Sequence, residues 1–143
     1  MLRLTKKLLF GIEAVLDIAY NAKARPVQAS AITKRQGIPK RYLEQVLQAL
    51  VRAGVLAGQR GPKGGYRLAR PADAITVAEI VRIVRTIEIA PDPLMGAPAS
   101  ALGHKIVRPI WIDLQTELLA RLEKLTLAEL VERAKQSGVE SET

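Results

Sequence analysis

The segment from 39 to 53 carries four polar side chains at a spacing that fits one side of a helix. They are Arg41, Gln45, Gln48 and Arg52, separated by four, three and four residues. In the major groove of DNA, arginine pairs with guanine and glutamine with adenine through two hydrogen bonds each. A solvated helix face would show the same pattern, so the surrounding elements must decide between the two interpretations.

Three further polar residues lie near the start of this segment, namely Lys40, Tyr42 and Glu44. A helix N-terminus favours phosphate, which suits a lysine there. Glu44 can accept a hydrogen bond from the amino group of cytosine, but its charge repels phosphates. A carboxylate at this position therefore indicates selective base reading rather than general attraction to DNA.

The elements around this segment form a helix-turn-helix pattern. The buried side of the helix is expected to consist of Leu43, Val46, Leu47, Leu50 and Val51. A short helix is predicted over 28–36, and Gly37 ends it by allowing the left-handed conformation of a tight helix exit. This arrangement favours DNA reading over a solvated face. We include Gln28, at the start of the short helix, among the candidate DNA contacts.

A β-hairpin is predicted next, with strands over 55–59 and 66–70 on either side of the glycine-rich run 60–65. A hairpin directly after a helix-turn-helix makes a wing. Arg60 and Lys63 lie at its tip, where they could enter a minor groove or bind phosphates. For Lys63 alone, a plain solvated hairpin stays open. A nucleotide phosphate loop is excluded, because no Gly-Lys-Ser/Thr follows and no helix begins there.

The composition indicates a polyanionic partner and argues against catalysis. The formal net charge is 22 − 14 = +8, although RNA, a membrane surface or an acidic protein would also suit it. The chain has no cysteine, which excludes disulfides, cysteine-ligated zinc and cysteine-ligated iron–sulfur centres. The one histidine, His104, has only Asp92 in the same expected loop. We therefore predict no metal site, no cofactor and no enzyme activity.

The N-terminal region is expected to be an amphipathic helix over 5–22 rather than a targeting segment. Its apolar stretch follows Lys6 and Lys7 but is interrupted by Glu13 and Asp17, and no cleavage site follows. No run of the sequence approaches the length of a membrane span. We expect a cytoplasmic protein without a membrane partner.

The last third of the chain is expected to mediate dimerisation. Residues 89–103 are rich in Pro, Ala and Gly and show no periodicity, which indicates a loop. Pro109 is expected to open a long helix. Its apolar stripe comprises Trp111, Leu114, Leu118 and Leu122. The stripe could pack on the chain's own domain, but the long loop before it favours pairing with a second copy.

Together these patterns predict a mainly α fold with a small β-hairpin wing. A winged helix-turn-helix domain is expected over 1–88 and a linker over 89–108. A dimerisation helix and a terminal helix are expected over 109–138, and a frayed tail over 139–143. Two capping boxes support the helix boundaries, Thr76 with Glu79 and Thr126 with Glu129.

Several segments resemble the Rrf2 family of bacterial winged-helix regulators. They are LTKK, ITKRQGIPKRYLEQVLQALVRAGVL, RGPKGGYRLARP followed by ITVAEIVRIV, and then IW-DL and TLAEL, which together cover most of the chain. The combination of YLEQ with RGPKGGYRLAR is highly specific. The resemblance implies a homodimer that binds an imperfect palindrome. The residues implied for DNA contact are Arg41, Tyr42, Glu44 and Gln45 in the recognition helix and Arg60 in the wing.

The chain departs from this family in the segment that carries the sensor. Better-known members place three cysteines between the last helix of the DNA-binding domain and the dimer helix, where they ligate an iron–sulfur cluster. Here that stretch is IAPDPLMGAPASALGHKIVRP. The third residue before Trp111, where some members have a histidine ligand, is Arg108. We therefore predict that no such cluster is bound.

These inferences lead to one hypothesis and one alternative. The hypothesis is a sequence-specific transcription regulator, a homodimeric repressor that binds a palindromic operator in double-stranded DNA. Its signal stays open between a small molecule, a partner protein and none. The alternative is a protein-interaction adaptor that keeps the winged-helix scaffold and holds a partner enzyme. This alternative predicts weak DNA binding without sequence preference.

Overall fold

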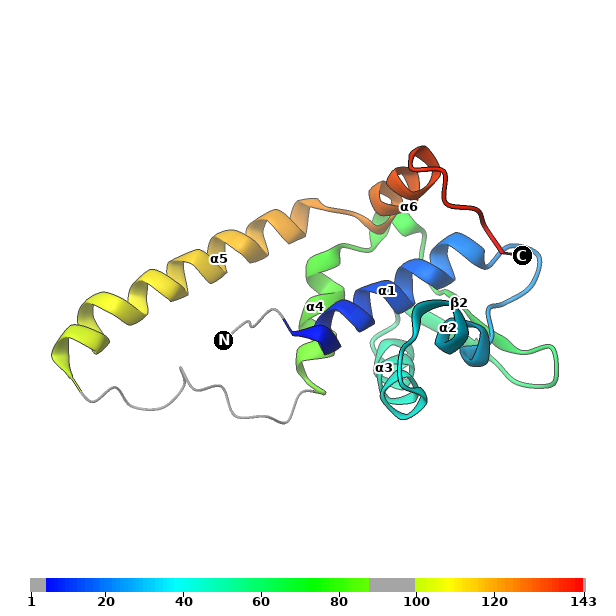
Figure 1. The fold of residues 1–143 in the computed structure, drawn as a ribbon, viewed down its shortest axis with the longest axis horizontal. Helices are drawn as coiled ribbons and strands as arrows, with labels where there is room; N and C mark the ends of the chain where they lie inside the picture. The colour runs from blue at the N-terminus through cyan, green and yellow to red at the C-terminus, as the bar shows by residue number, and fades with distance from the viewer. Residues whose placement is uncertain (1–4, 88–99, 143) are drawn as a thin grey trace.

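The computed structural model describes residues 5–87 and 100–142, and the fold is mainly helical with one two-stranded hairpin (Figure 1). In chain order the elements are α1 (Lys6–Asn21), α2 (Ala29–Gln36), α3 (Lys40–Arg52), β1 (Leu56–Gln59), β2 (Gly65–Leu68), η1 (Ala72–Ala74), α4 (Val77–Arg85), η2 (Gly103–Val107), α5 (Arg108–Lys124) and α6 (Leu127–Gln136). The predicted fold class is confirmed.

The core is built from branched aliphatic side chains, as expected for a chain with 3% aromatic residues. Ile18 of α1, Ile32 of α2, Leu47 of α3 and Ile80 of α4 are all fully buried in it. Leu127 of α6 is buried in the same cluster. The terminal helix therefore packs on the N-terminal half of the chain.

The helix-turn-helix forms as the sequence predicts. Gly37 ends α2 in the left-handed conformation, with φ of 67°, and its N–H donates to the carbonyl of Thr33 over 2.9 Å. Ile38 in the turn is buried, and Pro39 precedes the first residue of α3. The buried side of α3 holds Leu43, Val46, Leu47 and Leu50, as predicted, whereas Val51 is exposed.

The wing is attached to the connection between α1 and α2. Its strands pair antiparallel from Leu56 with Leu68 to Gln59 with Gly65. Val27 bonds to Tyr66 through both backbone groups, over 2.7 and 3.0 Å. Gly65 has a φ of 152°, and a side chain there would run into the carbonyl of Val27. Close approach of two backbones thus requires this glycine.

Both predicted capping boxes begin a helix. The hydroxyl of Thr76 accepts a hydrogen bond from the N–H of Glu79 over 3.2 Å, at the start of α4. Thr126 does the same for Glu129 at the start of α6, also over 3.2 Å. The two capped ends lie side by side, because Leu127 donates to the carbonyl of Ile75 over 2.9 Å.

The expected linker over 89–108 needs correction at its end. The chain is already helical from Ala101, passes through the wide turn η2 and continues into α5, so Pro109 does not open the helix. In this turn the N–H of Arg108 donates to the carbonyl of Gly103. Proline lacks an N–H, and its ring crowds the carbonyl four residues back, which the wider turn accommodates. Most of the predicted loop, 89–99, lies outside the described residues.

Figure 1 shows α5 as a long helix that begins away from the rest of the structure and runs back toward it, ending beside α6. The expected fraying after Gly138 is wrong for residues 139–142, which make hydrogen bonds to α1.

Across residues 5–87 and 100–142, no helix combines the length and apolar character needed to cross a membrane.

Candidate nucleic-acid interface

The side of α3 opposite the core presents most of the predicted base-reading residues. Arg41, Glu44, Gln45, Gln48 and Arg52 are all exposed. Leu43, Val46, Leu47 and Leu50 are buried, so packing of this stripe fixes the direction of the polar face. The face carries donors and acceptors together, which is the combination that base edges in a major groove require.

The N-terminal end of α3 is joined to the first turn of α1 through Tyr42. This residue is half-buried, and its hydroxyl donates to the carbonyl of Lys7 over 2.6 Å. The Nζ of Lys7 lies 5.9 Å from the centre of the Tyr42 ring. Beside it, the Nζ of Lys6 lies 5.6 Å from the centre of the Phe10 ring, which is itself 6.3 Å from Tyr42.

Lys6 and Lys7 therefore extend the basic surface at the start of α3. The sequence interpretation missed them as interface residues, since it treated them as residues that flank an apolar stretch and as part of the LTKK segment. Nothing local marks them, because their position beside Tyr42 depends on a contact between residues 35 apart in the sequence. Exposed cations at this place suit phosphate groups next to the bases that α3 would read.

A groove of about 680 Å³ lies between the start of α2, the second half of α3 and the wing. Its polar lining includes Gln28, Gln48, Arg52, Gln59 and Arg60. The structure thus brings Gln28, Gln48 and Arg60 to one place, as their joint assignment to DNA requires. The amide of Gln28 donates to the carbonyl of Pro62 over 3.1 Å, so this residue also holds the wing tip against α2.

The basic residues of the wing divide into two groups. Arg67 donates to the carbonyls of Lys23 and Ala24 over 2.8 and 3.0 Å, which fixes the connection after α1. Arg70 bonds to the carbonyl of Gly54 over 3.2 Å and pairs with Glu79. These two arginines hold the fold. Arg60 and Lys63 are exposed near the tip and remain the candidates for DNA.

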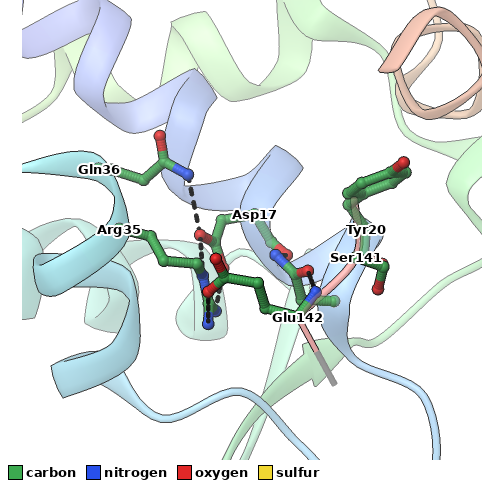
Figure 2. Close-up of polar contacts among 7 residues, drawn as sticks. Asp17, Tyr20, Arg35, Gln36, Ser141 and Glu142 are labelled. Carbon is green, nitrogen blue, oxygen red and sulfur yellow. Dashed lines mark hydrogen bonds and ion pairs between the residues drawn. The ribbon is translucent and has the colours of Figure 1, made fainter. Parts of the chain in front are cut away.

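A buried ion pair fixes the end of α2 against α1 (Figure 2). Both oxygens of Asp17 accept from Arg35, over 2.7 and 2.9 Å, and Gln36 donates to the same carboxylate over 2.9 Å. Burial raises the pKa of Asp17, but the hydrogen bonds from Arg35 and Gln36 and the charge of Arg35 outweigh it, so the pKa lies below its usual 3.8. The hydrogen bond to Asp17 raises the pKa of Arg35.

The predicted dimer residues on α5 have different surroundings. Trp111, Leu114 and Leu118 are 52%, 46% and 44% exposed. Leu122, by contrast, is half-buried against the chain's own core, near the ion pair of Arg82 with Glu123 that joins α4 to α5. The end of α5 is therefore held by its own domain, while its first three turns present an uncovered apolar surface.

The comparison with known proteins assigns the family. The family model described as "Rrf2: Iron-dependent Transcriptional regulator" matches residues 4–133. The chain belongs to the Rrf2 family. The HTH-type transcriptional regulator IscR of Escherichia coli is 37% identical over 131 residues, which cover 91% of this chain and 80% of that relative.

Solved Rrf2 structures share the fold over nearly the whole chain. IscR of T. potens has a TM-score of 0.74 and 27% identity, covering 99% of this chain and 94% of that one. CymR of B. subtilis, the global cysteine regulator of that organism, has a TM-score of 0.72 and 26% identity, covering 93% and 98%. This Rrf2 chain is thus a DNA-binding transcription regulator, and the expectation that it is not an enzyme is confirmed.

The family's description names iron. The residues of this Rrf2 member do not fit iron bound as a cluster through cysteine thiolates. The sequence has no cysteine to supply a thiolate. In the part of the chain that the structure describes, no three His, Cys, Asp or Glu residues come together as a metal site. His104 is exposed in η2 and belongs to no cluster of potential metal ligands among the described residues.

Proposed function

We propose that the protein is a homodimeric repressor that binds a palindromic operator and does so without an iron–sulfur cluster. The observation that carries the proposal is the exposed face of α3, where Arg41, Glu44 and Gln45 stand together above a buried aliphatic stripe. Arginine, carboxylate and amide groups on one helix face can distinguish guanine, cytosine and adenine in the major groove. Gln48 and Arg60, which line the groove shared with the wing, add contacts on one flank of that helix.

Dimerisation is supported by the uncovered apolar surface of α5. Trp111, Leu114 and Leu118 lie along one side of the helix and are each about half exposed, and clustered exposed apolar side chains of this kind are typical of interaction sites. Pairing of this surface with the same surface of a second copy gives two-fold symmetry. Two copies of α3 would then meet two half-sites of opposite direction, which is the arrangement of a palindrome.

Regulation by a cluster is disfavoured by the donor set. Iron–sulfur clusters in proteins are held mainly by cysteine thiolates, and this chain has none. We propose that the DNA-binding state does not depend on iron and that any signal acts through a small molecule or a partner protein.

The deciding experiment is selection of bound sequences from a random duplex pool at near-physiological salt, with the purified protein sized in the same buffer. We expect a palindromic motif with half-sites one helical turn apart or a multiple of it, and a dimeric mass. Supplementing the protein with iron and sulfide should leave the motif and the affinity unchanged. Recovery of no motif would refute operator binding and favour the adaptor hypothesis, in which a partner enzyme is held instead.

A further inference from the structure

Residues 139–142 return from α6 to the surface formed by α1 and α2 (Figures 1 and 2). The hydroxyl of Tyr20 donates to the carbonyl of Val139, and the hydroxyl of Ser141 donates to the carbonyl of Tyr20 over 3.1 Å. The N–H of Glu142 donates to Oδ1 of Asn21 over 2.8 Å. We call residues 139–142 the strap.

The strap ends on the helix-turn-helix itself. Oε2 of Glu142 lies 3.4 Å from a terminal nitrogen of Arg35, near the end of α2. The side chain of Arg35 is only 18% exposed, and its guanidinium is bound by Asp17 of α1 as well. Arg35 is thus held by two carboxylates, one from α1 and one from the strap, just before the turn at Gly37 that leads into α3.

We propose that the strap positions the helix-turn-helix for DNA recognition, with Glu142 and Arg35 as positioning residues. The proposal rests on α3 being the helix that reads the operator. The strap follows α6, which packs on α1, and its Glu142 contacts Arg35, so it connects the C-terminal part of the chain to the end of α2. The family model ends at residue 133, and the strap therefore lies beyond the part that this model describes.

The charge of the strap makes the test unambiguous. Removal of residues 139–143 takes away Glu140 and Glu142, so the formal net charge rises from +8 to 8 + 2 = +10. A change of charge alone would strengthen binding to DNA, because DNA is a polyanion. Loss of affinity on removal of the strap would have the opposite sign and would reveal positioning.

The experiment compares the full chain with a chain that ends at Gly138. We expect roughly fivefold weaker binding to the selected operator, since the hydrogen bonds of the strap to α1 and its ion pair with Arg35 of α2 are lost. Binding to random duplex should stay equal or become stronger. In hydrogen exchange, the amides of Ile32 and Gly37 in and after α2 should exchange faster, while those of α4 serve as the internal reference.

Single substitutions separate the strap from a general effect of its charge. Glu142→Gln should weaken operator binding and speed amide hydrogen exchange in α2. Both effects should be smaller than those of the truncation. Glu140→Gln makes the same chemical change two residues away, and we expect it to leave exchange in α2 unchanged. If the shortened chain does not fold, the Ser141→Ala/Glu142→Gln variant replaces it in the same two assays.

Operator affinity equal to or above that of the full chain, together with unchanged exchange in α2, would refute the positioning role. If the full chain selects no operator, the proposed function fails, but exchange in α2 still reports whether the strap orders the helix-turn-helix. The two failures are therefore distinguishable.

Discussion

Tyr42 has a structural role in addition to the DNA contact proposed for it. The resemblance to known regulators implies a DNA contact, but the hydroxyl donates to the carbonyl of Lys7 and the ring is half-buried beside Phe10. Its structural role is thus to hold the start of α3 against α1. Gln45 lies one turn after Arg41 on the exposed side of α3. Because its side chain is exposed rather than packed against α1, Gln45 is the better test of base reading.

Replacement of Gln45 by alanine should reduce the affinity for the operator and should remove the preference for one base at a single position of the operator. Loss of an amide that pairs with adenine costs about 1–3 kcal/mol of discrimination. The measurement is the affinity for a set of operators that differ at single base pairs, at fixed salt. Gln136→Ala, the same change on exposed α6, is the matched control and should have no effect. Equal affinity of Gln45→Ala and the unsubstituted protein for every operator would contradict base reading.

Asp17 should make stability depend on pH in the acid range only. Its pKa in the folded state is below the usual 3.8, so its contribution is complete above pH 3.8 and is lost as the pH falls through the lower folded value. Asp17→Asn leaves the charge of Arg35 without its buried partner and should cost about 3 kcal/mol at pH 7. That cost should shrink as the pH is lowered into the acid range.

Urea unfolding at pH 7, 5 and 3 measures this difference. Asp113→Asn, at an exposed position of α5, is the control and should behave like the unsubstituted protein. A difference between Asp17→Asn and the unsubstituted protein that stays constant from pH 7 down through the acid range would show that Asp17 does not stabilise the fold through its charge.

At the scale of elements, local patterns were sufficient for the DNA-binding half. The turn at Gly37, the hairpin around 60–65 and the caps at Thr76 and Thr126 all have short-range causes, namely a left-handed φ, a glycine-rich reversal and a hydroxyl that accepts from an N–H three residues on. The helix at 101–108 was missed because a helix exposed on most sides shows no apolar period.

Contacts between distant parts of the chain could not be predicted in this way. The strap was expected to fray because terminal residues are poorly ordered unless other elements bind them, yet it is bound by Tyr20 and Asn21 of α1. Similarly, Lys7 reaches the interface only through Tyr42. Both depend on how α1 packs against other elements, which single-residue types and spacing do not encode.

Replacement of Leu118 by glutamate should dissociate the proposed dimer. A charge at this position would be buried without a partner when two copies of α5 pair, whereas in the monomer it is solvated at a site 44% exposed. Ala120→Glu is the matched control, since two residues turn a helix by about 200° and place the same charge on the opposite side.

Sedimentation of both variants and circular dichroism test this expectation. Leu118→Glu should be a folded monomer with much weaker operator binding, and Ala120→Glu a dimer. Dimeric Leu118→Glu at micromolar concentration would place the interface elsewhere than on the stripe of Trp111, Leu114 and Leu118.

For the whole molecule, the net charge of +8 matters through its placement. Basic side chains lie at the start of α1, along α3 and at the wing tip, whereas Arg35, Arg67 and Arg70 are used within the fold. The exposed groups can release counterions from DNA, and the internal ones cannot. Formal charge therefore overstates the number of phosphate contacts, which salt dependence measures directly.

Replacement of Lys63 by glutamine should weaken the binding of the protein to all DNA duplexes alike and should lower the salt dependence of that binding. Each phosphate contact contributes about 0.9 to the slope of log K against log salt, so a dimer that loses two such contacts should lose about 1.8. Affinity for the operator and for random duplex, measured between low and physiological salt, gives both slopes. Lys124→Gln removes an exposed charge at the end of α5 and should leave them unchanged. An unaltered slope for Lys63→Gln would mean that Lys63 at the wing tip does not contact phosphate. A loss of affinity that depends on the identity of one base pair would instead make Lys63 a base-reading residue.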